Sequence, residues 1–303
     1  DHVIRQDHAI KDNQKNALPV SKIAISISDD GIITMENDGN GIDVAEHPEH
    51  KIWIPEMIFA HLRTSTNYDE NKKEKIVGGK NGFGFKLVLI WSTWGKIETI
   101  DHTRGLKYVQ EFSDNLNVIG KPKITKCGSK PMTKVSFKPD YARFGIEGLT
   151  PDMLSLLKKR VYDISAVTDK SIKVLYNATP VTVKTFQQYI DLYIGPKSET
   201  ARVYEQSDNR WEYAVCISPS DEFQQVSFVN GISTNKGGKH VEYILNQIVR
   251  KMVALIKKKK KVDVKAAAIK EQLMLFIRCD IENPSFNSQT KDELGTSSAN
   301  FGS

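Results

Sequence analysis

The sequence predicts an α+β protein built from two successive domains. Its 303 residues are enough to form two hydrophobic cores. From Ile23 to Met35 apolar residues alternate with small or polar ones, as they do in half-buried strands. From Val241 to Ile256 apolar residues recur every three or four positions, which is typical of a helix with one buried face. We place the two domains at 1–168 and 169–303.

The first domain is expected to begin with a β-hairpin. Ile23–Ile27 and Ile32–Met35 have strand patterning, and Asp29-Asp30-Gly31 between them is typical of a hairpin turn. Asn37-Asp38-Gly39-Asn40-Gly41 then ends regular structure. A helix follows over Pro55–Arg63, with proline at the position favoured in the first helical turn.

The middle of the first domain contains a long polar segment, Thr64–Gly84, which we expect to be a loop. Loops of this length inside compact domains are usually functional. Phe85–Trp91 is nearly all apolar and is expected to start a buried helix. Met153–Thr168 has helical spacing of its apolar residues and is expected to be the last helix of this domain.

The second domain is expected to contain strands at Ile172–Tyr176 and Val226–Val229. Val241–Ile256 is the most regular helical pattern in the chain. Asp263–Leu275 is expected to be a second helix because it includes three consecutive alanines.

Composition and charge exclude several classes of protein. Hydrophobic residues make up 39% of the chain and charged residues 26%, as in soluble globular proteins. No apolar run approaches the roughly 20 residues of a membrane helix, so no membrane association is expected. Three scattered cysteines form neither a disulfide framework nor a metal-binding pair. The first residue is not methionine and the last residues form no recognisable tail, so we expect the chain to be a fragment of a longer protein.

The segment Gly78–Lys86, GGKNGFGFK, carries most of the chemical information. Its four glycines allow the backbone to approach a ligand closely, and the helix expected to follow presents amide groups at its N-terminus. Lys80 and Lys86 add positive charge, so the segment suits a triphosphate. An ordinary glycine-rich surface loop is the alternative from these residues alone. The segment is not a Walker P-loop, and Gly39–Val44 lacks the last glycine of a dinucleotide fingerprint.

Together, Asn37–Gly41 and Gly79–Gly84 resemble the paired glycine motifs of the GHKL ATPases. Within that superfamily the chain resembles the type IIA DNA topoisomerases of eukaryotes and large DNA viruses, through Thr64–Asp69, Gly78–Lys86 and Ile281–Lys291. The resemblance extends in order over essentially the whole chain. It implies a GHKL (Bergerat) ATP-binding α/β sandwich followed by a ribosomal-protein-S5-like transducer domain with a βαβ element.

The resemblance also implies an ATP site in which Asn37 hydrogen-bonds the adenine amino group. The other residues that the resemblance places at the nucleotide are Ser65, Thr66, Asn67, Gly79, Lys80, Asn81, Gly82, Phe83, Gly84, Phe85, Lys86, Gln289, Thr290 and Lys291. Gln289 and Lys291 are the expected catalytic residues, because a lysine at the γ-phosphate stabilises the charge that develops as the bond breaks. The simpler alternatives are that Asn37 is an ordinary turn residue and that Lys291 is an exposed surface lysine.

The five consecutive lysines, Lys257, Lys258, Lys259, Lys260 and Lys261, are expected to end the long helix. A solvated helix end is the simpler explanation, since lysines there favour the helix dipole. By resemblance this region instead contacts double-stranded DNA, without reading its sequence.

As a whole, the resemblance implies an ATP-driven gate that dimerises with a second copy and couples hydrolysis to the passage of one DNA duplex through another. The cofactors are ATP and Mg²⁺. The family's general-base Glu and Mg²⁺-binding Asn are expected just before the segment that Asp1–Arg5 resembles, so we predict no metal ligand within 1–303. The expected location is the nucleus for a cellular protein, and the host cytoplasm or viral factory for a viral one. Alternatives are a MutL-like repair ATPase, a chaperone of the same superfamily, or a non-catalytic DNA-binding fragment.

Overall fold

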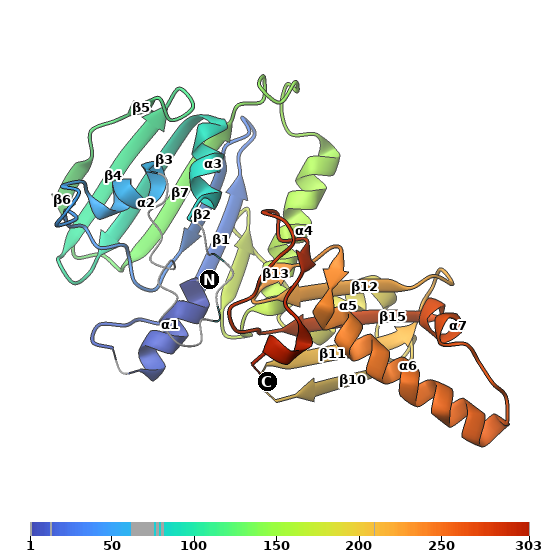
Figure 1. Ribbon diagram of the computed structural model, residues 1–303. Coiled ribbons are helices and arrows are strands. Elements are labelled where there is room, and N and C mark those ends of the chain that lie inside the picture. Colours follow the sequence, from blue (N-terminus) through green and yellow to red (C-terminus); the bar gives the residue numbers. More distant parts are fainter. Residues whose placement is uncertain are drawn as a thin grey trace. The chain divides into compact units, whose positions relative to one another are not determined.

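The computed structural model describes residues 2–302 except 13, 62–75, 77–78, 80–81 and 209, and except the side chains of residues 5 and 8. The described chain divides after Lys184 into two compact units, each with its own sheet (Figure 1). The domain boundary predicted after residue 168 therefore lies too early. Strands β8 (Lys173–Tyr176) and β9 (Thr179–Pro180) belong to the first unit, because β8 pairs in parallel with β1 (Lys22–Ile27).

A mixed sheet forms the centre of the first unit, with strand order β5-β4-β3-β7-β2-β1-β8-β9 and β6 paired to β4. The predicted hairpin is confirmed, since β1 and β2 pair antiparallel with Ile25 opposite Met35. Besides β8 and β9, the strands of this sheet are β1 Lys22–Ile27, β2 Ile33–Asn37, β3 Ser92–Asp101, β4 Leu106–Ser113, β5 Val118–Ile119, β6 Lys123–Lys126 and β7 Met132–Pro139.

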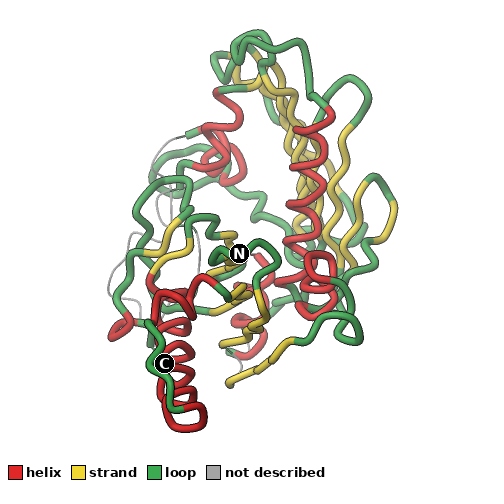
Figure 2. The backbone as a smooth tube through the Cα atoms, turned by 90° about the vertical axis from the view of Figure 1, so that its right-hand side faces the viewer, coloured by secondary structure: helices red, strands yellow, loops and turns green. Residues whose placement is uncertain are grey.

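Helices cover one face of this sheet. Phe59, Leu89 and Leu157, each from a different helix, pack against Ile97 of β3 and Phe137 of β7. Figure 2 shows the long helix α4 running alongside the strands. The helices of this unit are α1 His2–Lys11, α2 Ile54–Ala60, α3 Gly84–Ile90 and α4 Pro151–Val167. The last three correspond to the helices predicted from sequence.

The opposite face of the same sheet is charged. Glu98 lies within 4.0 Å of three lysine ammonium groups, those of Lys96, Lys107 and Lys134. Charged cross-strand neighbours are typical of a sheet face in contact with water. The first unit is therefore a sandwich of two layers, helices on sheet.

The second unit has a sheet with strand order β10-β11-β15-β12-β13, in which only β12 and β15 pair in parallel. No helix among the described residues is both long and apolar enough to cross a membrane. The elements of this unit are α5 Phe186–Ile194, β10 Arg202–Ser207, β11 Trp211–Ile217, β12 Gln224–Val229, β13 Ile232–Ser233, β14 Gly237–Gly238, α6 Lys239–Lys260, α7 Ala266–Glu271, β15 Leu273–Cys279, β16 Glu293–Leu294 and the 3₁₀ turn η2 Ser298–Asn300.

Helices lie on both faces of the second sheet. On one side the apolar stripe of α6, including Leu245 and Val249, packs against Leu275 and Ile277. On the other side the ring of Tyr193 in α5 meets Phe276 edge-on, with centroids 5.6 Å apart. Strand β15 is consequently buried along nearly its whole length.

The parallel strands β12 and β15 with α6 between them form the βαβ element implied by the family resemblance. The helix predicted over Asp263–Leu275 is wrong, because only Ala266–Glu271 is helical and the chain continues as β15. A short apolar run fits a buried helix or a buried strand equally well, and here pairing with β12 and β11 decides for the strand.

Candidate functional site

The turn after β2 is built around two glycines. Gly39 has a φ of +87°, which glycine adopts without strain. At Gly41 a Cβ atom would lie 1.9 Å from the carbonyl oxygen of Ile100, so only glycine allows this approach to β3. The backbone conformation at Gly39 and the close approach to β3 at Gly41 therefore explain both glycines of this sequence motif.

Two polar side chains hold the same turn in place. The Asp38 carboxylate accepts hydrogen bonds from the amides of Ser21 at 2.7 Å and Lys22 at 2.8 Å, and Asn40 Oδ1 accepts from the Leu18 amide at 2.8 Å. Burial alone would raise the pKa of Asp38, but the hydrogen bonds from Ser21 and Lys22 lower it below its ordinary value. These hydrogen bonds thus hold the turn in one position at the end of β2.

Asn37, the last residue of β2, faces the helix-covered side of the sheet. It stands opposite Thr133 of β7, which in turn stands opposite Thr99 of β3. Partners that lie opposite each other in a sheet point to the same face, and Val135 and Ile97 continue this face into the core. The result is a polar row, Asn37-Thr133-Thr99, at one end of an apolar face.

Thr99 and Thr133 are linked by their hydroxyl groups at 3.1 Å, and Thr99 Oγ1 accepts a hydrogen bond from the Ile42 amide at 2.9 Å. Thr133 is not among the site residues predicted from sequence. Its position opposite Asn37 depends on strand register, for which the linear sequence contains no direct signal.

Among the described residues, the helices leave this face partly uncovered toward Asn37. Ile33, at the other end of β2, is only 6% exposed, whereas Met35 on the same face is 43% exposed. Asn37, two residues further, is half-buried, and its Nδ2 group donates to the Asp38 carbonyl at 2.9 Å. An apolar surface with a polar border and open to solvent is the kind of place where small ligands bind.

Helix α3 begins at the end of the glycine-rich segment. Leu87 N–H donates to Phe83 O at 3.1 Å, so the amides of Gly84, Phe85 and Lys86 precede the first hydrogen bond within the helix. These amides form the positive end of the helix dipole. Gly82, with a φ of +66°, and Gly84 are both exposed, and a Cβ on Gly84 would touch nothing within 4 Å.

Phe85 and Lys86 point into the protein. The Phe85 ring meets the rings of Phe59 and Phe137 edge-on, with centroids 5.2 and 5.9 Å apart. Lys86 is only 2% exposed, and burial lowers the pKa of its ammonium group. An anionic group bound beside Lys86 would raise this pKa again, because opposite charge favours the protonated form.

The remaining predicted site residues of the first unit are only partly within the described chain. Gly79 is half-buried. Ser65, Thr66, Asn67, Lys80 and Asn81 lie outside the described residues.

In the second unit, Gln289, Thr290 and Lys291 form the tip of a loop between β15 and β16. The Thr290 hydroxyl donates to Asp292 at 2.8 Å, and the Lys291 amide donates to Ser288 O at 3.1 Å. Gln289 and Thr290 are exposed and Lys291 is half-buried, with a left-handed φ of 60°. Burial lowers the pKa of the Lys291 ammonium group.

The base of this loop is tied to the start of α6. Strand β16 pairs in parallel with β14, and a Cβ on Gly238 would lie 2.5 Å from the backbone of Leu294. The Lys236 amide also donates to Asp292 O at 2.9 Å. The tip residues are therefore connected, through β16 and β14, to the N-terminal end of α6, which covers one face of the second sheet.

Lys257 to Lys260 form the last turn of α6, and Lys261 caps it in a left-handed conformation, as predicted for the helix end. All five are exposed. Lys257 pairs with Asp263 at 2.8 Å.

A separate cavity of about 570 Å³ lies at the β1–β2 turn, lined by Asp29, Asp30, Lys138, Tyr141 and Glu147 among others. It is at the opposite end of β2 from Asn37, because β2 runs from this turn to Asn37. This cavity is therefore distinct from the polar row.

Comparison with known proteins identifies the family. The DNA gyrase B family profile matches residues 183–302. DNA topoisomerase 2 of Acanthamoeba polyphaga mimivirus is 45% identical over 277 residues, covering 90% of this chain and 22% of that protein. The chain spans about a fifth of the length of the curated relatives it matches.

Two solved structures are similar over nearly all of the chain. The ATPase region of Saccharomyces cerevisiae topoisomerase II superposes with a TM-score of 0.89 at 41% identity, covering 100% of this chain and 77% of that one. The ATPase and transducer domains of DNA topoisomerase II from Balamuthia mandrillaris give a TM-score of 0.89 at 36% identity, covering 99% and 76%. The two units therefore have the expected GHKL and transducer folds, and the chain belongs to the type IIA DNA topoisomerase family, within its ATPase region.

Proposed function

We propose that this chain is the ATP-operated gate of a type IIA DNA topoisomerase, which couples ATP hydrolysis to the passage of one duplex through another. The observation that carries the proposal is the open end of the helix-covered face in the first unit. There, Asn37 and Thr133 border an apolar surface, next to a turn that requires two glycines. Family membership supports the same assignment.

Adenine would lie on this open surface with its amino group at Asn37. A base held by fixed polar partners is selected because a wrong base leaves those partners unpaired. The amides at the start of α3, together with Lys86, would receive the phosphates. Ser65, Thr66, Asn67, Gly79, Lys80 and Asn81 are assigned to ribose and phosphates by resemblance alone.

Gln289 and Lys291 are proposed to contact the γ-phosphate when ATP is bound. The tip of their loop is exposed, and its base is fixed to α6 through β14 and β16. A γ-phosphate contact is lost once ATP becomes ADP, so this loop could report which nucleotide is present and pass that information to α6. Mg²⁺ would be held chiefly by phosphate oxygens, and we assign it no ligand among the described residues.

The partners proposed for the full protein are a second copy, through the ATPase gate, and double-stranded DNA. Lys257 to Lys261 are the proposed DNA contacts, because five exposed ammonium groups at one helix end attract phosphates without reading bases. The proposed location is the nucleus for a cellular protein, or the host cytoplasm or viral factory for a viral one. The comparisons favour this proposal over a MutL-like ATPase, a chaperone or a non-catalytic DNA-binding fragment.

The proposal is tested by the ATP-dependent relaxation of supercoiled DNA by the full-length protein. We expect Lys291→Ala to slow ATP turnover and relaxation by roughly 100-fold, as expected when a group that stabilises the transition state is lost. Lys251→Ala, which removes an exposed lysine from α6, is the matched control and should keep wild-type rates. Equal turnover by the two variants would remove Lys291 from the mechanism, and relaxation without ATP would contradict the gate itself.

A further inference from the structure

A tight turn precedes helix α2 in the first unit. The amide of His47 donates to Ile52 O at 2.8 Å, and the amide of Lys51 donates back to His47 O at 2.9 Å. Lys51 closes the turn with a φ of +53°. On its α2 side the turn is held by the Ile54 amide, which donates to Ala45 O at 2.9 Å.

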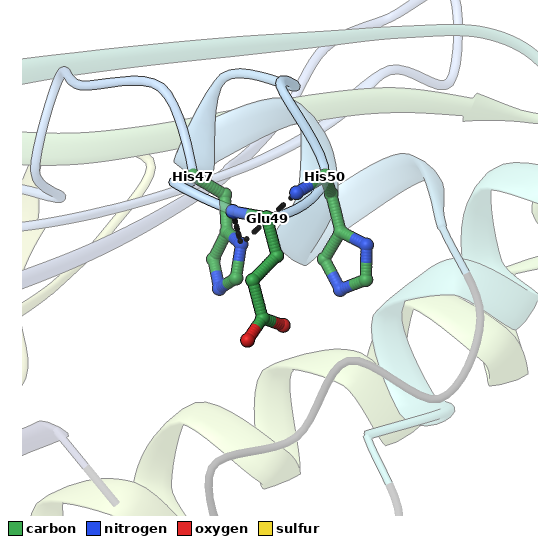
Figure 3. Close-up of side chains that lie close together, drawn as sticks. All are labelled: His47, Glu49 and His50. Carbon is green, nitrogen blue, oxygen red and sulfur yellow. Dashed lines mark hydrogen bonds between the residues drawn. The ribbon is translucent and has the colours of Figure 1, made fainter.

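Three side chains of this turn extend to the same side of the backbone, those of His47, Glu49 and His50 (Figure 3). One nitrogen of each imidazole and one carboxylate oxygen all lie within 4.8 Å of one another. The two imidazole rings are stacked, with centroids 4.7 Å apart and planes 25° from parallel. Glu49 and His50 are exposed, and His47 is half-buried.

We propose that His47, Glu49 and His50 form a binding site for one divalent transition-metal cation of the zinc class. Two imidazoles and a carboxylate are the ligands that such cations prefer, whereas Mg²⁺ and Ca²⁺ prefer oxygen ligands alone. Tetrahedral ligands about 2.1 Å from zinc are roughly 3.4 Å apart. Exposed side chains such as Glu49 and His50 can close that difference by rotation, and water would complete the coordination.

The hydrogen bonds of His47 specify what must change when the cation binds. Its Nδ1 accepts from the amides of Glu49 at 3.3 Å and His50 at 3.4 Å, so the neutral ring holds its proton on Nε2. A cation bound at Nδ1 would take the lone pair that now accepts these bonds, and a cation bound at Nε2 would move the proton to Nδ1. In either case both amides must turn away from the ring. The two bonds are at the long limit of hydrogen bonding, so losing them costs little. The amides of Glu49 and His50 therefore report on metal binding.

The segment that leads into the turn is held to the first sheet by a hydrogen bond. The Val44 amide donates to Asp101 Oδ2 at 2.9 Å. Although burial alone would raise the pKa of Asp101, hydrogen bonds from Val44, Thr103 and Arg104 lower it to about 2. A cation here would fix the turn that leads into α2 and stabilise the folded first unit by mass action. This proposal does not depend on the nucleotide site.

The test is a calorimetric titration of Zn²⁺ into the metal-free protein, with amide NMR spectra recorded in parallel. We expect one Zn²⁺ ion to bind at micromolar concentration and to shift the amide signals of Glu49 and His50, while Mg²⁺ leaves both unchanged. His50→Ala and Glu49→Gln should each weaken this binding by more than about tenfold, since even outer-shell changes cost roughly 10- to 100-fold. Lys51→Gly, which retains the turn and removes no ligand, should bind as the wild type does.

Zinc held elsewhere in the protein would give a different pattern. Equal affinities for the wild type and for both ligand variants would overturn the proposal. Unmoved amide signals of Glu49 and His50 at saturating Zn²⁺ would overturn it as well.

Discussion

The two larger sheets of this protein differ in how much of their surface helices cover. In the second unit α5 and α6 lie on opposite faces, and β15 between them is almost fully buried. Among the described residues of the first unit, helices pack on one face, and beyond Ile33 that face is partly exposed at Met35. The first sheet thus has exposed surface on its helix side at Met35, whereas the central strand β15 of the second sheet is buried from both sides.

This difference matches the roles proposed for the two units. The open face ends in a polar row that can orient a base, next to a turn that glycines bring close to β3. The second unit instead carries its proposed functional residues at its margins, in the loop tip at Gln289–Lys291 and at the lysine end of α6. A packed core of this kind can transmit a movement from one margin to the other without deforming.

The largest expected effect tests the difference in coverage directly. Phe276→Ala removes a fully buried ring between the second sheet and α5, so the free energy of unfolding of the second unit should fall by about 3–5 kcal/mol. Met35→Ala, on the open face, should cost about 1 kcal/mol or less. Urea unfolding measures both. A loss at Met35 as large as that at Phe276 would mean that the first face is covered after all.

The two glycine motifs should respond differently to alanine. Gly41→Ala puts a Cβ against the Ile100 carbonyl, and we expect it to destabilise the first unit by on the order of 3 kcal/mol. Gly84→Ala meets no neighbour and should leave stability unchanged or raise it by up to about 1 kcal/mol, because alanine is the better helix former. Thermal unfolding distinguishes them. Equal losses in the two variants would show that Gly84, like Gly41, is required by the fold.

The second unit should lose stability in acid through the buried His240. Burial lowers the pKa of this histidine from 6.5 to about 3. Between these values the unfolded chain binds a proton that the folded chain does not, so stability is present above pH 6.5 and is lost as the pH falls. At pH 5 the loss attributable to His240 is about 2 kcal/mol.

Urea unfolding at pH 8 and at pH 5 measures this dependence. His240→Gln should lower stability at both values and reduce the difference between them by about 2 kcal/mol. The other titrating groups are common to both proteins and cancel. An unchanged difference would mean that His240 is protonated in the folded protein.

The smallest expected effect concerns the lysine end of α6. Replacing Lys258, Lys259 and Lys260 by glutamine should reduce the slope of log affinity for DNA against log salt by about 3, since each phosphate contact contributes about 0.9. Glutamine at Lys121, Lys123 and Lys126, exposed lysines of the first unit, makes the same charge change and should leave the slope nearly unaltered. Equal reductions would indicate a general effect of net charge.

Local patterns predicted much of this fold. The β1–β2 hairpin and helices α3, α4 and α6 follow from residue periodicity, and each lies within a few residues of its predicted place. Strand β3 was not predicted, because Thr99 and Asp101 are buried polar residues that obscure the alternation. Their hydrogen bonds to the 42–44 segment make that burial possible, and such partners are invisible in the linear sequence.

Long-range pairing accounts for the other differences. Leu273–Cys279 is a strand because β11 and β12 lie on either side of it, and β8 belongs to the first unit because it pairs with β1. Thr133 joins the candidate site for the same reason, through its register with Asn37. Glycines and polar turn residues could be recognised in sequence, whereas the side chains that pairing brings beside them could not.

Hydrogen–deuterium exchange of the full-length protein, with and without a non-hydrolysable ATP analogue, tests the nucleotide site most directly. The proposed site predicts slower exchange of amides at residues 37–41, 84–86 and 133 when the analogue is bound, and unchanged exchange at the cavity by Asp29 and Asp30. Asn37→Ala should weaken these changes, while Asn117→Ala, in an exposed turn, should preserve them. Slower exchange at Asp29 and Asp30 with none at 37–41 would place the nucleotide elsewhere and contradict the account.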